Sequence, residues 1–284
     1  LLSRCDRVSQ ARLPSMRICA VSLLLSLCLP AANAAQWHVA PGESLVAVVQ
    51  RAAAGDEVVV ERGQYVGNLL IDKPLKLIGL NRPTLSGGNK GDVIRITAPD
   101  VTVQGFIVRD SGGDLGDQNA GIYVYPGAHR AVIRNNDFAY VLFGLWIEKA
   151  NNVRVENNLI TGKRDFISSQ RGNGIQLYNT TGAQIIGNHI SFTRDAIYVD
   201  VSHHALCRAN HMHHSRYGTH YMNSYHNIWE YNETYLNRGG LALMEVRDQI
   251  VRYNIAWGNS DHGIMLRTIE GATVEHNIVA GNSR

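Results

Sequence analysis

The chain has 284 residues, of which 45% are hydrophobic and 18% are charged. This composition supports a folded core and excludes an intrinsically disordered protein. The formal net charge of +3 comes from the first 34 residues, because the rest of the chain holds 23 basic and 23 acidic residues. No stripe of Lys and Arg remains, which argues against a nucleic-acid-binding protein and against binding to an anionic membrane.

Residues 16–34 have the three parts of a secretory signal peptide. Met16 and Arg17 precede an apolar run over 18–29, and the small residues Ala32-Asn33-Ala34 follow. We expect cleavage after Ala34. The apolar run is too short to span a bilayer of about 30 Å as a helix, and no later stretch reaches about 20 apolar residues. The mature chain is therefore predicted to be exported, without insertion into a membrane, and residues 1–15 are interpreted as upstream or added sequence.

A short apolar segment, 45–54, follows Pro41-Gly42-Glu43-Ser44. It is compatible with a helix that caps the open end of a repeat structure, because solenoids need their terminal hydrophobic layer covered.

Two sets of residues recur with one period in the rest of the chain. Asparagines stand at 136, 158, 188, 210, 232, 254 and 277, and a glycine-led strand motif starts at 121, 144, 174, 196, 218, 240 and 263, with alanine in place of glycine at 196. Both sets repeat every 22 or 23 residues, apart from one interval of 30. The short β-branched and aromatic runs between them are typical of strands. The pattern predicts an all-β fold over 35–284: a right-handed parallel β-helix with coils of about 22 residues.

Stacked coils turn the repeat into side-chain ladders. Asparagine tolerates a left-handed backbone at a corner, and stacked amides hydrogen-bond along the axis. In the glycine-led strands, the first and third residues after glycine are expected to point inward and the second and fourth outward. Cys207 falls on an inward ladder with Ile185 and Trp229, so we interpret it as a packing residue. The outward positions include four aromatic residues that we take as candidates for binding a partner: Tyr123, Trp146, Tyr178 and Tyr198.

Two longer connections, at 111–119 and 162–171, fall between the asparagine and the glycine of their coils. Insertions on one side of a repeat array commonly build a binding edge; tolerated surface insertions remain the alternative. The sequence stops a few residues into a coil, so we expect the solenoid to continue beyond Arg284.

Seven of the twelve histidines lie between His203 and His226. Ladder spacing sets His204 against His226, and it stacks Met222 on Met244 on the outer face. Thioethers and imidazoles together favour Cu(I) over Mg, Ca or Mn. The candidate metal ligands are His220, Met222, Met244, Met265, His262, His226 and His204. A docking surface for another protein, in which Met and aromatic residues are enriched, is the competing interpretation.

An enzyme of the polysaccharide lyase or epimerase type is a further alternative for a β-helix, with Asp195 beside Arg194 and Asp261 beside His262 as candidates. Such a groove should present several basic residues outward. The outer ladders of the glycine-led strands, as aligned here, carry only Arg267, which disfavours this alternative.

Three segments carry a family resemblance: YGTHYMNSYHN (217–227), NRGGLALMEVRDQIVRYN (237–254) and WGNSDHGIMLR (257–267). They resemble the NosD family of periplasmic maturation proteins for nitrous oxide reductase. The resemblance implies a non-catalytic periplasmic scaffold that helps to assemble the copper-sulfide centre of the reductase. Implied partners are the reductase, the ATPase and permease of an ABC transporter, and a copper-donating lipoprotein. Copper, as Cu(I), would be bound only transiently.

Overall fold

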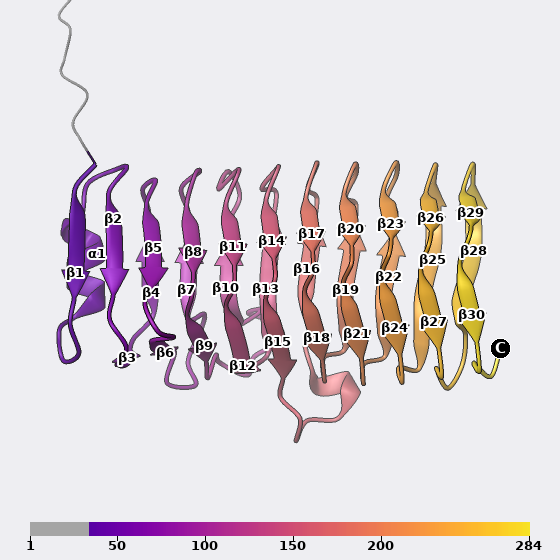
Figure 1. Ribbon diagram of the computed structural model, residues 1–284, viewed down its shortest axis with the longest axis horizontal. Coiled ribbons are helices and arrows are strands. Elements are labelled where there is room, and N and C mark those ends of the chain that lie inside the picture. Colours follow the sequence, from indigo (N-terminus) through magenta and orange to yellow (C-terminus); the bar gives the residue numbers. More distant parts are fainter. Residues whose placement is uncertain (1–33) are drawn as a thin grey trace, which may run out of the picture. The chain divides into compact units, whose positions relative to one another are not determined.

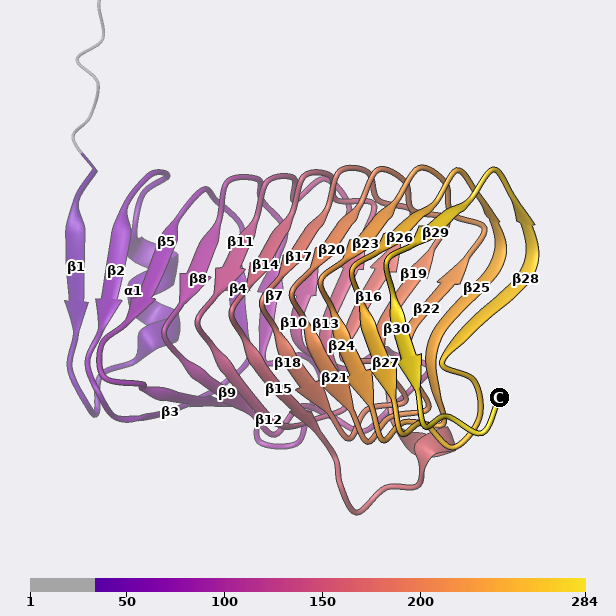
Figure 2. The ribbon, with the colours of Figure 1, turned by 45° about the vertical axis from the view of Figure 1, so that its right-hand side comes forward.

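The computed structural model describes residues 34–284, and the predicted signal peptide and the segment before it lie outside the described residues. Within this range the chain winds into a right-handed parallel β-helix built from three parallel sheets (Figures 1 and 2). Each regular coil contributes three strands in chain order: the first joins sheet A, the second joins sheet B and the third joins sheet C. This confirms the fold class predicted from the two repeating sets of residues.

Sheet A has eleven strands in the described residues: β1 (Gln36–Val39), β2 (Glu57–Val60), β5 (Lys76–Gly79), β8 (Thr102–Gln104), β11 (Val132–Arg134), β14 (Arg154–Glu156), β17 (Gln184–Ile186), β20 (Leu206–Arg208), β23 (Ile228–Glu230), β26 (Ile250–Arg252) and β29 (Thr273–Glu275). Sheet B has ten: β3 (Gln64–Val66), β6 (Thr84–Ser86), β9 (Ile107–Arg109), β12 (Asp137–Val141), β15 (Leu159–Gly162), β18 (His189–Ser191), β21 (His211–His213), β24 (Glu233–Tyr235), β27 (Ile255–Trp257) and β30 (Ile278–Ala280).

Sheet C has nine strands in the same range and carries the longest ones: β4 (Leu69–Ile71), β7 (Ile94–Ile96), β10 (Ala120–Val124), β13 (Phe143–Glu148), β16 (Ile175–Tyr178), β19 (Asp195–Asp200), β22 (Tyr217–Met222), β25 (Gly239–Arg247) and β28 (Ile264–Glu270). Its register is the one predicted, with Met222 opposite Met244 and Trp146 opposite Gln176. The inward positions of β10 to β25 are fully buried, whereas Leu266 at the edge strand β28 is 47% exposed.

The predicted capping helix is present as α1 (Leu45–Arg51), and the side chain of Ser44 accepts a hydrogen bond from the backbone of Ala47 at its N-terminus. Its buried residues Leu45, Val48 and Val49 join the core. The helix packs against β4, the first strand of sheet C. It therefore covers apolar side chains at the beginning of the solenoid.

The asparagine ladder lies buried at the corner between sheets A and B. Asn210 shows the pattern: its Nδ2 donates to Ile185 O (2.8 Å) and to Asn232 Oδ1 (2.9 Å), and its Oδ1 accepts from the backbone and the amide of Asn188 (2.9 and 3.0 Å). The predicted bonding along the axis is confirmed. The expected left-handed backbone lies instead one residue earlier, as at Ala209 (φ 54°) and Tyr231 (φ 57°), so the ladder asparagines serve amide pairing and not the turn itself.

Glycine at the corner before sheet C has a different explanation. A Cβ on Gly174 would clash with Ile190 of sheet B and with the carbonyl of Ala196 in the next coil. Close approach of two sheets and two coils therefore requires glycine here, without any left-handed backbone at that residue.

Replacing Asn210 with Leu keeps the side-chain volume but removes the amide partner of two buried backbone groups, the carbonyl of Ile185 and the N–H of Asn188. We expect the free energy of unfolding to fall by about 2 to 5 kcal/mol, since each unpaired buried polar group costs roughly 1 to 3 kcal/mol. Urea unfolding followed by circular dichroism measures the change. Gln184→Leu, on the solvent face of β17, is the control, and an equal effect of both substitutions would contradict the role of the ladder.

Candidate functional site

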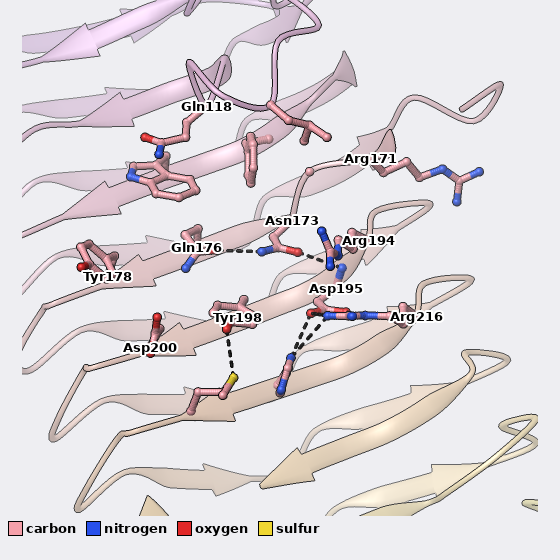
Figure 3. A pocket seen from close by; sticks show the side chains of 16 residues that line it. Gln118, Arg171, Asn173, Gln176, Tyr178, Arg194, Asp195, Tyr198, Asp200 and Arg216 are labelled. Atoms are coloured by element: carbon pink, nitrogen blue, oxygen red, sulfur yellow. Dashed lines mark hydrogen bonds and ion pairs between the residues drawn. The ribbon is translucent and has the colours of Figure 1, made fainter. Parts of the chain in front are cut away.

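The outer face of sheet C is hollowed into a cavity of about 630 Å³ (Figure 3). Its floor is formed by β13, β16, β19 and β22, and one side by the connections 110–119 and 163–174, the second of which contains a short 3-10 helix (Ser168–Gln170). These are the two insertions predicted to build a binding edge. The cavity is lined by Leu115, Gln118, Phe143, Trp146, Arg171, Gly172, Asn173, Gln176, Tyr178, Arg194, Asp195, Tyr198, Asp200, Arg216, His220 and Met222.

Aromatic side chains form the wall of this cavity. Trp146 packs edge-on against Phe143, with ring centroids 5.0 Å apart, and Tyr178 and Tyr198 follow on β16 and β19. Three of the four predicted partner-binding residues, Trp146, Tyr178 and Tyr198, thus share one concave surface. The fourth, Tyr123, is buried beside it, and its hydroxyl donates to Glu148 (2.6 Å).

Asp195 is the most deeply buried charge of the site, with a side chain that is 0% exposed. Arg216, one coil further along, donates two hydrogen bonds to its carboxylate (2.8 and 2.6 Å), and Nδ1 of His220 lies 3.2 Å away (Figure 3). Burial alone would raise the pKa of Asp195, but the hydrogen bonds from Arg216 and His220 outweigh it and lower this pKa. The carboxylate therefore stays ionised.

The hydrogen bond to Asp195 fixes the orientation of His220 and leaves its other nitrogen free. Nε2 of His220 is buried and has no hydrogen-bond partner in the described residues, and His220 is one of the residues that line the cavity. An imidazole that is held by a carboxylate through one nitrogen and offers the other is the usual arrangement of a metal-ligating histidine. His220 is thus prepared to accept a metal ion or a proton at Nε2.

Two thioethers follow His220 on the same face of sheet C. Met222 is two residues further along β22 and lines the cavity, whereas Met244, its register partner in β25, is not among the lining residues. The sulfur of Met222 accepts a hydrogen bond from the hydroxyl of Tyr198 (3.2 Å). Burial, followed by the charges of Asp200 and Asp195, raises the pKa of Tyr198 to about 12, so its hydroxyl remains a donor at neutral pH.

The other predicted metal ligands are spread over a wider area. Met265 pairs with Ala242, which in turn pairs with His220, so one coil lies between Met265 and His220. Nδ1 of His262 lies 3.1 Å from Asp261 at the corner before β28. His204 and His226 stack at another corner, between sheets C and A, with centroids 5.0 Å apart, and Asp248 lies 3.5 Å from His226. These two histidines do not line the cavity.

Arginines at the corner between sheets B and C were missed by the sequence argument. Arg171, Arg194 and Arg216 all line the cavity, and Arg95 extends the outer ladder at Tyr123. The expectation that this face carries a single arginine was therefore wrong. The signal was present, because Arg194, Arg216 and Arg238 stand two residues before the glycine-led motif in three successive coils, but only strand positions were considered.

A second group of histidines lies outside the cavity, on sheet B. Nε2 of His189 and Nε2 of His213 are 2.7 Å apart, and Nδ1 of His213 is 2.6 Å from Nδ1 of His214. His211, in register with His189, contacts Glu233 (2.9 Å). Burial and the neighbouring imidazoles lower the pKa of His213 to about 4.

Within residues 34–284, no three or more His, Cys, Asp or Glu side chains are grouped so that they could hold a metal ion. Methionine sulfurs fall outside that set. Cys207 is fully buried, and burial raises the pKa of its thiol to about 12, so it is a packing residue as expected. No helix in the described part of the chain is long and apolar enough to cross a membrane.

The motifs around this cavity match a known family. The family model described as "Periplasmic copper-binding protein (NosD)" covers residues 156–284. Residues 156–284 of this chain are thus similar to the NosD family. Two relatives, each named "Probable ABC transporter binding protein NosD", come from Pseudomonas aeruginosa and Stutzerimonas stutzeri and are 40% and 33% identical over 133 residues. Those residues are 47% of this chain, and it spans only about a third of the relatives, 31% and 30% of their lengths.

Solved structures resemble this chain in fold alone. The Dettilon tailspike protein has a TM-score of 0.60 at 15% identity, covering 84% of this chain and 64% of its own. An alginate lyase from Paenibacillus sp. str. FPU-7 has a TM-score of 0.55 at 12% identity, covering 86% of this chain and 99% of its own. At such identities the likeness supports the β-helix and carries no activity with it.

The histidines on sheet B predict a pH dependence of stability. Because the folded-state pKa of His213 is about 4 and its ordinary value is 6.5, the unfolded chain binds more protons than the folded chain between these values. Stability should therefore be complete above about pH 6.5 and decline as the pH falls toward 4. Thermal unfolding measured from pH 8 to 4 tests this. His213→Phe, which keeps the stacking on Tyr235 (5.0 Å), should flatten the decline; an unchanged slope would contradict the assignment.

Proposed function

We propose that this chain is part of a periplasmic accessory protein for the maturation of nitrous oxide reductase, and that it receives Cu(I) at the cavity on sheet C. In this proposal copper is a transient cargo, supplied by a lipoprotein and released toward the copper-sulfide centre of the reductase. The ATPase and permease of an ABC transporter are the further partners. The description of the family model supports periplasmic copper binding. The names of the two relatives support an ABC transporter partner.

One observation carries the copper proposal: a buried imidazole nitrogen without a partner lies on the same strand face as a thioether, next to a second thioether. His220 and Met222 stand two residues apart on β22 and therefore share its outer face, and Met244 lies in the next coil. Adjacent strands lie about 4.8 Å apart, so two flexible methionine side chains and one fixed imidazole can converge on one ion. A donor set of one nitrogen and two sulfurs suits Cu(I) better than hard divalent ions.

The surroundings fit a site that exchanges its cargo. Met222 and Met244 are only partly buried. The hydroxyl of Tyr198 donates a hydrogen bond to the sulfur of Met222, and a bound metal ion would replace this hydrogen bond. The aromatic wall of Trp146 and Tyr178 borders the same opening, where a partner protein could deliver or receive the ion. Met265 and His262 both belong to the coil of β28, and in this proposal they would extend the site by one coil beyond Met244. His204 and His226 would form a separate pair.

A polysaccharide lyase or epimerase remains the second candidate, and the arginines of the cavity favour it. Arg194 lines the cavity together with Tyr198 and His220. An arginine can neutralise a uronate, and a tyrosine or histidine can move a proton. Asp195 would hold His220 as the base. Against this candidate, the charge of Arg216 is compensated by Asp195 through two hydrogen bonds, which weakens its attraction for a uronate.

Replacing Met222 and Met244 together with Leu should leave the fold intact, because both side chains are partly exposed. We expect Cu(I) affinity, measured by competition with a chromophoric Cu(I) chelator under reducing conditions, to fall by at least about a hundredfold, since two of three ligands are lost. Met212→Leu, in the buried core, is the matched control and should bind as the parent does. Equal affinities of all three proteins would remove the site.

The two candidate functions separate in a second experiment. We expect the full-length protein to restore copper to nitrous oxide reductase in a deletion strain, and the variant carrying both Leu substitutions to fail. Incubation of the protein with alginate and pectate should give no unsaturated uronate product and no change in epimer composition. Product that disappears in His220→Asn would instead establish the enzyme.

A further inference from the structure

The arginines at the corner between sheets B and C border a second hollow, of about 520 Å³, next to the copper cavity. Its lining includes Arg171, Arg194, Arg216 and Arg238, together with hydroxyl groups of serines, and contains no acidic side chain. Arg171, Arg194 and Arg216 border both hollows. Positive charge is therefore concentrated where the two hollows meet.

The coil repeat is the cause of this concentration. Arg194, Arg216 and Arg238 follow one another at intervals of 22 residues, and Arg216 N donates to the carbonyl of Arg194 (2.6 Å). Equivalent residues of adjacent coils are about 4.8 Å apart. Like charges at that spacing repel one another unless an anion compensates them.

Only part of this charge is compensated within the described residues. Arg216 is paired with Asp195 through two hydrogen bonds, and Arg238 lies 3.8 Å from Asp261. Arg171 donates instead to the backbone carbonyls of Lys163 (3.1 Å) and Arg164 (2.9 Å).

Neither Arg171 nor Arg194 has a carboxylate within ion-pair distance in the described part of the chain. Asp165, whose charge acts on Arg171 from further away, is bound to the hydroxyl of Tyr140 (2.8 Å). Two guanidinium groups at the boundary of the two hollows thus have no carboxylate partner in the described residues.

The first cavity also contains an unsatisfied donor. Nε1 of Trp146 is buried and has no hydrogen-bond partner in the described residues, and Trp146 lines the cavity that Arg171 and Arg194 border. A ligand with oxygen acceptors would satisfy it. Guanidinium groups recognise planar or tetrahedral oxyanions through parallel N–H donors.

We propose that Arg171 and Arg194 form an oxyanion site at the junction of the two hollows, distinct from the copper ligands on β22 and β25. Carboxylate, sulfate and phosphate groups share the required chemistry. Because both hollows are larger than a bare ion and the first is lined by aromatic side chains, the occupant carries its anionic group on an organic body. The site therefore gives the same face of sheet C affinity for an anionic ligand in addition to a soft metal ion.

Isothermal titration calorimetry of the intact chain at neutral pH tests the site, with sodium malonate, sulfate and phosphate as probes and ionic strength held constant with sodium chloride. We expect saturable binding with one site per chain for at least one probe. Arg194→Gln should weaken it by tenfold or more, because a charged hydrogen-bonding group is lost. The side chain of Arg194 makes no hydrogen bond in the described residues, so this variant should fold normally.

Two controls make the result decisive. Arg62→Gln removes an exposed arginine near β3, away from both hollows, and should leave binding unchanged. The variant with Met222 and Met244 both replaced by Leu should keep the oxyanion affinity of the parent, which separates failure of this site from failure of the copper proposal. Absence of saturable binding for all three probes, or equal affinity in Arg194→Gln and the parent, would overturn the oxyanion site.

Discussion

The buried asparagine ladder at the corner between sheets A and B is the interaction on which the rest of the structure depends. Each amide bonds to the backbone and the amide of the neighbouring coils, so a coil that slipped by one residue would leave several buried polar groups unpaired. Such groups are costly in a closely packed interior. The ladder therefore holds successive coils in one register, and every side-chain ladder on the outer surface inherits that register.

The candidate site follows from this constraint. Because coils cannot slip, Met222 must face Met244, and Asp195 must face the coil that carries Arg216 and His220. One buried carboxylate then does two things: it neutralises one arginine, and it holds the imidazole of His220 through Nδ1, which leaves Nε2 without a partner in the described residues. The two longer connections at the corner between sheets B and C close one side of the cavity, and the second of them places Arg171 there.

The fold could be predicted from the sequence almost completely, because a period of 22 residues fixes strand order, register and inward faces at once. The register that sets Met222 against Met244 was predicted correctly for that reason. The arginines were not, since they stand at a corner where alternation along a strand gives no direction. The partnership of Asp195 with His220 was also missed: it joins two positions that are not opposite each other in the register, and side-chain length, not backbone spacing, decides it. The left-handed corner residues were misplaced by one position, because asparagine was credited with turning the chain when its amide bonding was the stronger requirement.

The central claim is that coil register brings one imidazole and two thioethers to a single ion. X-ray absorption spectroscopy at the copper edge, on the chain loaded with one equivalent of Cu(I), tests it most directly. The account predicts a first shell of two sulfur scatterers and one nitrogen scatterer with the multiple scattering of an imidazole ring. A shell of nitrogen and oxygen alone would contradict it.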